Sequence, residues 1–76
     1  QEDTVLVQGI IDVFFVEEDG IVLLDYKTDR VQNAGELIKR YQAQLHLYAL
    51  ALGRTMDLPV KEILIYSFYL EKIIAL

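Results

Sequence analysis

The sequence predicts an α+β domain in which one long helix packs on a β-sheet. Two segments rich in β-branched and apolar residues precede a stretch with helical periodicity, and a third such segment follows it. The chain has 76 residues, so we expect one domain. No internal repeat, low-complexity segment or linker interrupts the order β-β-α-β, and a short fourth strand is expected at the end.

The first two β segments are expected to pair as an antiparallel hairpin. Residues 5–16 are mainly β-branched and aromatic, and residues 21–28 open with four apolar residues in a row. The acidic residues 17–19 and Gly20 between them are typical of a turn. Because the second segment is apolar without alternation, we expect it to be buried on both faces and central in the sheet.

The stretch between Asn33 and Gly53 has the pattern of one amphipathic helix. Asn33 is a favourable N-cap, and Glu36 stands three residues later, as in a capping box. Gly53 is expected to end the helix after about 19 residues. The stripe expected to face the sheet recurs at helical intervals and consists of Leu37, Tyr41, Gln44 or Leu45, Tyr48 and Leu52.

The end of the chain returns to β composition. Residues 61–70 predict a third strand, in which apolar residues alternate between the two faces. Residues 73–76 are expected to form a last short strand after a turn near Glu71 and Lys72. No Gly, Asn or Pro marks that turn.

The composition excludes several classes of protein. The chain has no cysteine, which rules out disulfide bonds, zinc–thiolate sites and iron–sulfur clusters. It has no apolar run of about 18 residues and no secretory signal, so we expect no membrane contact and a cytoplasmic location. The net charge of −5 argues against a protein that coats DNA by itself. Clustered acids are, however, compatible with a magnesium centre.

Asp25-Tyr26-Lys27 is the most informative sequence, because it closes the second apolar run. Side chains alternate across a strand, so Asp25 and Lys27 share a face and Tyr26 points away. Asp12 lies on the preceding predicted strand and reaches the same cation if the register suits. Two carboxylates and an ammonium predict a metal-dependent centre that acts on a phosphodiester. The alternative is a surface ion pair worth about 0–1 kcal/mol.

Three motifs together resemble the PD-(D/E)XK nuclease superfamily, and more narrowly the RecB-type nuclease domains of AddAB-type helicase–nucleases. They are Gly-Ile-Ile-Asp at residues 9–12, Leu-Leu-Asp-Tyr-Lys-Thr-Asp at 23–29, and Gln-Leu-His-Leu-Tyr at 44–48. The resemblance covers nearly the whole chain. It implies a restriction-endonuclease-like core with a mixed sheet and one long helix packed on it. The first helix of that core is missing, so residues 1–76 are expected to be a single partial nuclease domain, a fragment of a larger helicase–nuclease.

The resemblance implies roles for individual residues. Asp12 and Asp25 would bind the metal with the backbone carbonyl of Tyr26, and Lys27 would be the catalytic lysine. The metal would be Mg²⁺, for which Mn²⁺ can substitute.

Gln44 and Tyr48 match the Gln-x-x-x-Tyr motif of the family and share a helix face. They would act at the catalytic site, Gln44 by binding Lys27 or DNA and Tyr48 near the DNA backbone, although core packing is the alternative for Tyr48. Asp29 is expected to anchor the following loop, and His46 to lie on the helix surface.

The resemblance also implies an activity and partners. The full protein would be an ATP-dependent helicase–nuclease of double-strand-break repair and recombination, and this domain a Mg-dependent deoxyribonuclease with exonuclease action. Its substrate would be DNA, delivered as single strands by the helicase motor, and its partner an AddB-like protein. The fragment alone would be weak or inactive. Two alternatives are a non-catalytic scaffold of the same fold and a small acidic protein-interaction domain.

Overall fold

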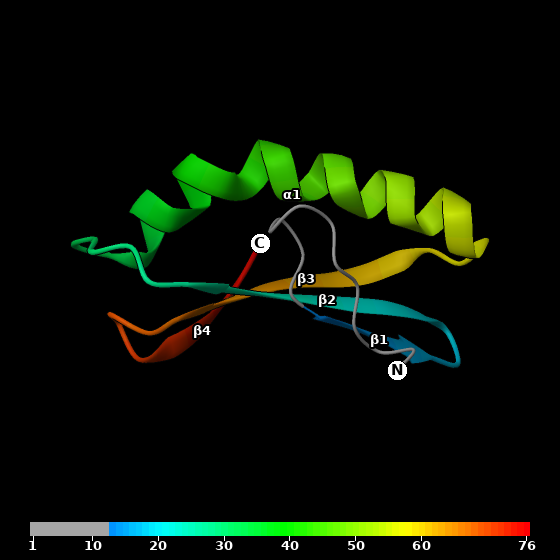
Figure 1. Ribbon diagram of the computed structural model, residues 1–76, viewed down its shortest axis with the longest axis horizontal. Coiled ribbons are helices and arrows are strands. Elements are labelled where there is room, and N and C mark those ends of the chain that lie inside the picture. The colour runs from blue at the N-terminus through cyan, green and yellow to red at the C-terminus, as the bar shows by residue number, and fades with distance from the viewer. Residues whose placement is uncertain (1–12) are drawn as a thin grey trace.

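One helix lies along one face of a four-stranded sheet in the computed structural model of the chain, which describes residues 13–76 (Figure 1). The strands are β1 (Val13–Glu17), β2 (Gly20–Lys27), β3 (Val60–Ser67) and β4 (Lys72–Ala75), and helix α1 (Ala34–Met56) connects β2 to β3. The α+β class, the element order and the short fourth strand are thereby confirmed. Residues 5–12 of the predicted first strand lie outside the described range.

The sheet is mixed and runs in the order β1-β2-β3-β4. β1 pairs antiparallel with β2, and β3 pairs antiparallel with β4. The central pair, β2 and β3, is parallel, and α1 makes the long crossover that a parallel pair requires. The predicted hairpin and the central place of β2 are therefore confirmed.

The core lies between α1 and the sheet. Leu37 and Leu45 of the helix are almost fully buried, and Ile21 of β2 and Ile65 of β3 are fully buried against them. Each such side chain contributes about 1.5–3 kcal/mol by leaving water. The predicted stripe is observed, with Leu45 and not Gln44 in its middle place; Tyr41, Tyr48 and Leu52 pack on the edge of the core.

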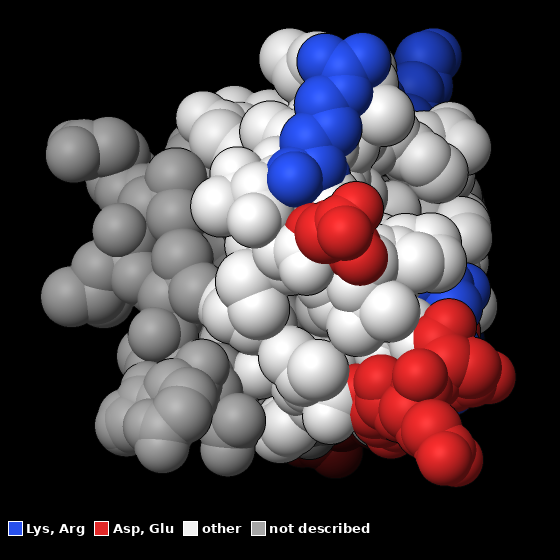
Figure 2. All heavy atoms as spheres, turned by 90° about the vertical axis from the view of Figure 1, so that its right-hand side faces the viewer, with Lys and Arg blue, Asp and Glu red and all other residues white. Residues whose placement is uncertain are grey.

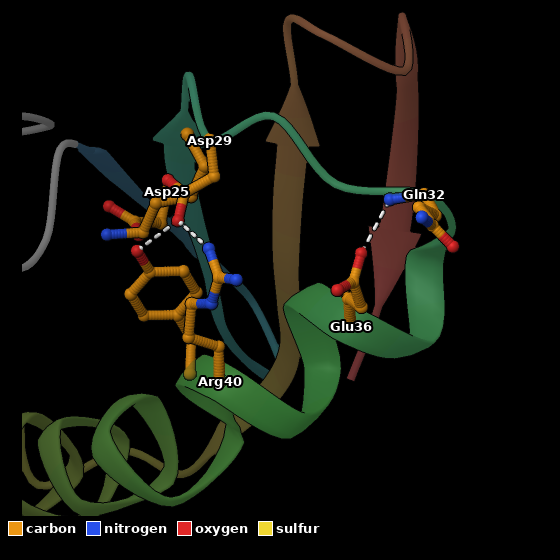
Figure 3. Close-up of polar contacts among 7 residues, drawn as sticks. Asp25, Asp29, Gln32, Glu36 and Arg40 are labelled. Carbon is orange, nitrogen blue, oxygen red and sulfur yellow. Dashed lines mark hydrogen bonds and ion pairs between the residues drawn. The ribbon is translucent and has the colours of Figure 1, made fainter.

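The start of α1 follows the predicted cap. Asn33 is the N-cap, and its Oδ1 accepts a hydrogen bond from the Glu36 N–H at 3.1 Å. The Glu36 carboxylate accepts from the backbone N–H of Gln32 at 2.5 Å (Figure 3). The reciprocal bond of the capping box is thus made one residue before the N-cap.

The predicted helix end at Gly53 is wrong, because α1 continues to Met56 and has 23 residues. Asp57 then takes the left-handed conformation at φ 55°, which Asp tolerates better than most residues. The Leu58 N–H donates to the Gly53 carbonyl at 3.1 Å and the Asp57 N–H to the Arg54 carbonyl at 3.4 Å, the pattern of a Schellman motif. A Cβ at Gly53 would lie 3.2 Å from the Leu58 carbonyl oxygen, so a glycine here allows the chain that follows the helix to pass close to its last turn.

The predicted β1–β2 turn is observed, whereas the turn predicted near Glu71 and Lys72 lies earlier, because β3 ends at Ser67 and not at residue 70. The β1–β2 turn brings Glu17 opposite Gly20, and Gly20 is buried against the chain that enters β3. A Cβ there would lie 3.0 Å from the Pro59 carbonyl oxygen, so a larger residue would force the chain that enters β3 to shift by a few tenths of an ångström. The β3–β4 turn occupies residues 68–71, and Glu71 turns the chain with φ 57° although it is not a glycine. Within residues 13–76, no helix has the length and hydropathy that crossing a bilayer requires.

We predict that Asn33→Ala lowers the free energy of unfolding by about 1 kcal/mol, because the Glu36 N–H loses its acceptor at the helix start. Urea unfolding followed by circular dichroism measures this change. Gln32→Ala is the matched control, since Gln32 contacts Glu36 through its backbone N–H and keeps that bond. Equal unfolding midpoints for Asn33→Ala and the parent chain would show that the cap carries no stability.

Candidate active site

The functional side chains gather where β2 ends. Asp25 and Lys27 lie two residues apart on the face of β2 that α1 covers. Their neighbours on β3 are Ile65 and Ser67, both fully buried. Because β2 and β3 are parallel, both strands deliver their carboxyl ends to this edge of the sheet, and the chain leaves β2 there for the helix.

Asp25 is a buried acid, with 2 % of its surface exposed. Its Oδ2 lies 3.0 Å from Nζ of Lys27, whose side chain is 17 % exposed. A carboxylate removed from water needs a charged or hydrogen-bonding partner, and Lys27 provides one. The alternative of a surface ion pair between these two residues is therefore wrong.

The Lys27 ammonium has a second contact on the helix side. Its Nζ lies 4.1 Å from the centroid of the Tyr41 ring, within the range of a cation–π interaction. Tyr41 is in the N-terminal half of α1, which passes over the end of β2. The ammonium is thus held between a carboxylate of the sheet and an aromatic ring of the helix.

Asp29 connects this site to the helix. Its Oδ2 accepts hydrogen bonds from the Tyr41 hydroxyl at 2.6 Å and from Nη1 of Arg40 at 2.7 Å, and Figure 3 shows Asp29 and Arg40 directed toward each other from the β2–α1 loop and the helix. The Tyr41 hydroxyl, helped by Arg40, lowers the pKa of Asp29. The same bond raises the pKa of Tyr41. Asp29 thus anchors its loop, in agreement with the expectation from the sequence.

These contacts form one group, which we call the Lys27 cluster. It contains two acids, two bases and a neutral phenol between them, and in the order of their contacts its members are Asp25, Lys27, Tyr41, Asp29 and Arg40. Tyr41 was predicted from the sequence as a packing residue and was not assigned to the site. The signal was its position, three residues before Gln44 and seven before Tyr48, which places all three near one face of the helix.

The other predicted site residues lie elsewhere. Asp12 is outside the described residues. The Tyr26 side chain points to the opposite face of the sheet, as expected, where it stacks on Phe68 with a centroid distance of 5.7 Å. Gln44 is exposed on α1, and Tyr48 is half-buried against the core. His46 is exposed on the helix surface, as predicted.

The acidic turn lies at the other end of the molecule. Nζ of Lys61 is 2.6 Å from a carboxylate oxygen of Glu17 and 2.6 Å from one of Asp19. Lys61 lowers the pKa of Asp19, chiefly by this hydrogen bond. Figure 2 shows acidic side chains gathered on this end, which is the right-hand end of Figure 1. Much of the negative charge is therefore remote from the Lys27 cluster.

The donor set suits a hard divalent cation only in part. Within residues 13–76, no three His, Cys, Asp or Glu side chains stand close enough together to hold a metal ion. Asp25 supplies one buried carboxylate, and magnesium takes one or two carboxylates from a protein. The described β1–β2 ladder begins with Val13 opposite Leu24, the residue before Asp25.

Residues 2–73 match the family model of the PD-(D/E)XK nuclease superfamily. The chain belongs to this superfamily. The buried Asp25 and the partly exposed Lys27 lie on a central strand of this PD-(D/E)XK chain, and the helix that follows carries Gln44 and Tyr48. The recognition made from the three motifs is confirmed, and so is the fold class.

The chain is also similar to proteins named as the A subunit of an ATP-dependent helicase/nuclease. It is 60% identical over 73 residues to that of Lachnoclostridium phytofermentans, a match of 93% of this chain and 5% of the relative. It is 53% identical over 73 residues to that of Clostridium perfringens (93% of this chain) and 49% identical over 71 residues to that of Thermoanaerobacter pseudethanolicus (91%). The chain spans 6% of the length of each of these two relatives. The predicted likeness to AddAB-type helicase–nucleases is confirmed.

The Tyr41–Asp29 hydrogen bond needs a protonated phenol and an ionised carboxylate, so it predicts two pH limits of stability. The lowered pKa of Asp29 gives stability that is present above the ordinary Asp value of about 4 and is lost as pH falls through the lowered pKa. The raised pKa of Tyr41 gives stability that is present below the ordinary Tyr value of about 10 and is lost as pH rises through the raised pKa.

We therefore expect the free energy of unfolding of Asp29→Asn to depend less on pH than that of the parent chain, both below about pH 4 and above about pH 10. Urea unfolding across the pH range measures both limbs. Tyr41→Phe is the matched variant, because it removes the phenol and its bond to Asp29 and should flatten the alkaline limb in the same way. Parallel curves for the parent chain and Asp29→Asn above about pH 10 would contradict the hydrogen bond.

Proposed function

We propose that this chain is part of the metal-dependent nuclease domain of an ATP-dependent helicase–nuclease and that it hydrolyses DNA phosphodiester bonds. The observation that carries this proposal is the buried Asp25–Lys27 pair at the end of β2, in a chain of the PD-(D/E)XK superfamily. The names of the helicase/nuclease relatives support DNA as the substrate.

Mg²⁺ is the proposed metal, with Mn²⁺ as a substitute. Asp25 and Asp12 would hold it through their carboxylates and Tyr26 through its backbone carbonyl, an all-oxygen set that magnesium prefers. The placement of Asp25 at the end of β2 supports its part in this set, because its carboxylate would bind the metal while the Lys27 ammonium stays beside it on the same face. When bound, such a metal supplies an activated water and screens phosphate charge.

Lys27 would stabilise the negative charge that develops on the phosphoryl oxygens during hydrolysis. Its ammonium is held on one side by Asp25 at 3.0 Å and on the other by the Tyr41 ring at 4.1 Å. A cation fixed before the substrate arrives needs little reorganisation in the transition state, which is the main advantage of such a site over water. The remaining exposed fraction of Lys27, 17 %, leaves it open to a phosphate.

The helix that follows the catalytic strand would contribute to DNA binding. Gln44 is exposed on α1 and carries both donors and an acceptor for DNA. Tyr48 is half-buried, so it would act at the site while also packing on the core. The acidic turn around Asp19 is at the opposite end of the molecule, where it does not repel the backbone of DNA bound at Lys27.

The whole protein would act as an exonuclease in double-strand-break repair and recombination. Its helicase motor would use ATP to deliver single strands, an AddB-like protein would be its partner, and the cytoplasm its location. The relatives are far longer than this chain, which supports its being a fragment of such a protein. The fragment alone would be weak or inactive.

The retained Asp25–Lys27 pair disfavours a non-catalytic scaffold of the same fold. Such a scaffold would be as stable or more stable with apolar residues at these positions, because removing charges from water carries a desolvation penalty. An acidic interaction domain would have no reason to bury these charges under α1.

We expect Asp25→Asn, in the full-length polypeptide that contains this chain, to lower DNA cleavage by about 10²–10⁴-fold while ATP-driven unwinding continues. The variant keeps the side-chain volume and removes the charge that pairs with Lys27. Cleavage of labelled single-stranded DNA and a helicase assay on the same preparation measure the two activities. Asp19→Asn is the control that should leave both unchanged, and an Asp25→Asn protein with parental nuclease activity would refute the proposal.

Removal of divalent cations with a chelator is expected to stop cleavage, and Mg²⁺ or Mn²⁺ to restore it. Calorimetric titration with Mn²⁺ provides a second measurement. Asp25→Asn and Asp12→Asn should each weaken metal binding about 10-fold or more, whereas Asp19→Asn should not. Unchanged Mn²⁺ affinity in both variants would exclude these acids as ligands.

A further inference from the structure

The Lys27 ammonium is the group whose position matters most for the proposed reaction, and its side chain is intrinsically mobile. A lysine has four rotatable carbon bonds and loses about 2 kcal/mol of rotamer freedom when it is fixed. The ion pair with Asp25 fixes the distance between Nζ and the carboxylate at 3.0 Å, but one such contact does not fix the direction in which the ammonium lies. A second contact is needed to give the ammonium one direction.

Tyr41 makes that second contact. Its ring centroid lies 4.1 Å from Nζ of Lys27, on the helix side of the site. Asp25 holds the ammonium from the sheet and Tyr41 holds it from the helix, so the two contacts come from different elements. In a partly desolvated setting such as this, a cation–π contact is stronger than at an exposed site.

Asp29 in turn fixes the Tyr41 ring. The phenol donates a hydrogen bond of 2.6 Å to Asp29 Oδ2, and Arg40 Nη1 binds the same oxygen at 2.7 Å. Asp29 follows Lys27 by only two residues, so the contacts run from the strand to the helix and back to the chain just beyond the strand. A phenol that donates to a carboxylate also becomes more electron-rich, which strengthens the attraction of its ring for the ammonium.

We propose that Tyr41, held by Asp29, is a positioning residue that orients the Lys27 ammonium for phosphodiester cleavage. This inference deepens the proposed nuclease function and rests on it. Tyr41 does not touch the reacting atoms in this arrangement; it acts through Lys27. The alternative is that Tyr41 only packs on the core, which its half-buried ring also does.

Kinetics in the full-length polypeptide separate the two roles. Tyr41→Leu removes the ring and keeps apolar bulk, so we expect kcat to fall about tenfold or more with KM unchanged within about twofold. Tyr41→Phe keeps the ring and loses the bond to Asp29, so we expect a smaller fall in kcat, about two- to tenfold. Tyr66→Leu is the control for loss of a half-buried tyrosine, because Tyr66 packs with Tyr26 on the opposite face of the sheet.

A second measurement reports the position of Lys27 without catalysis. Lysines of the same polypeptide are dimethylated with ¹³C, which keeps their charge, and Lys27→Arg identifies the Lys27 methyl signal. The Tyr41 ring should shift this signal upfield, Tyr41→Phe should retain the shift, and Tyr41→Leu should abolish it. Melting temperature is measured for every variant. If Tyr41→Leu has a lower melting temperature than the parent, the kcat values of Tyr41→Phe and Asp29→Asn decide between a positioning role and a packing role for Tyr41.

The outcomes separate this inference from the proposed function. If Asp25→Asn and Lys27→Met both cleave DNA like the parent, the proposed nuclease site fails, and the positioning role for catalysis fails with it, whatever the methyl signal shows. If Lys27→Met is inactive but Tyr41→Leu and Tyr41→Phe keep the parental kcat, the positioning inference alone is overturned. An unshifted Lys27 methyl signal in the parent would also overturn it. Reduced kcat with an unchanged melting temperature and a lost methyl shift supports it.

Discussion

A carboxylate and an ammonium share the space between the sheet and the helix, and the burial of Asp25 constrains everything around them. Removing either partner of a buried pair typically costs about 3–5 kcal/mol, because the other charge is left without compensation. Lys27 must therefore stay on the same face of β2, at 3.0 Å from Asp25. The helix must also stay above both, since it excludes water from the pair and supplies the Tyr41 ring. Fold stability and site geometry are thus two results of one arrangement.

The crossover from β2 to β3 is what brings the helix to that place. A helix of 23 residues is about 34 Å long at 1.5 Å per residue, close to the 36 Å longest dimension of the molecule. Its first half carries Arg40 and Tyr41 over the end of β2, and its last turn returns the chain to the start of β3 beside Gly20. The same element therefore completes the core, covers the ion pair and positions its second contact.

Local sequence signals were sufficient wherever the structure depends on neighbours in the chain. The Asn33 cap, the hairpin around Gly20 and the shared face of Asp25 and Lys27 follow from short-range rules, and all are observed. Gly53 was misread because its role is close contact with Leu58 after the helix, which spacing alone does not reveal. Tyr41 was missed as a site residue for the same reason: its contact with Lys27 joins two elements whose relative placement is set by the crossover.

The alternation along β2 has a consequence for how this chain can change in length. Asp25 and Lys27 face the helix, whereas Tyr26 faces the aromatic cluster on the other side with Tyr66 and Phe68. Inserting or deleting a single residue between Gly20 and Lys27 would exchange these faces, turning the charges outward and the phenol inward. The alternation of the strand is therefore fixed, whereas the β3–β4 turn at residues 68–71 carries no member of the Lys27 cluster. Length variation during evolution should accumulate in the turns and spare the strand that carries the ion pair.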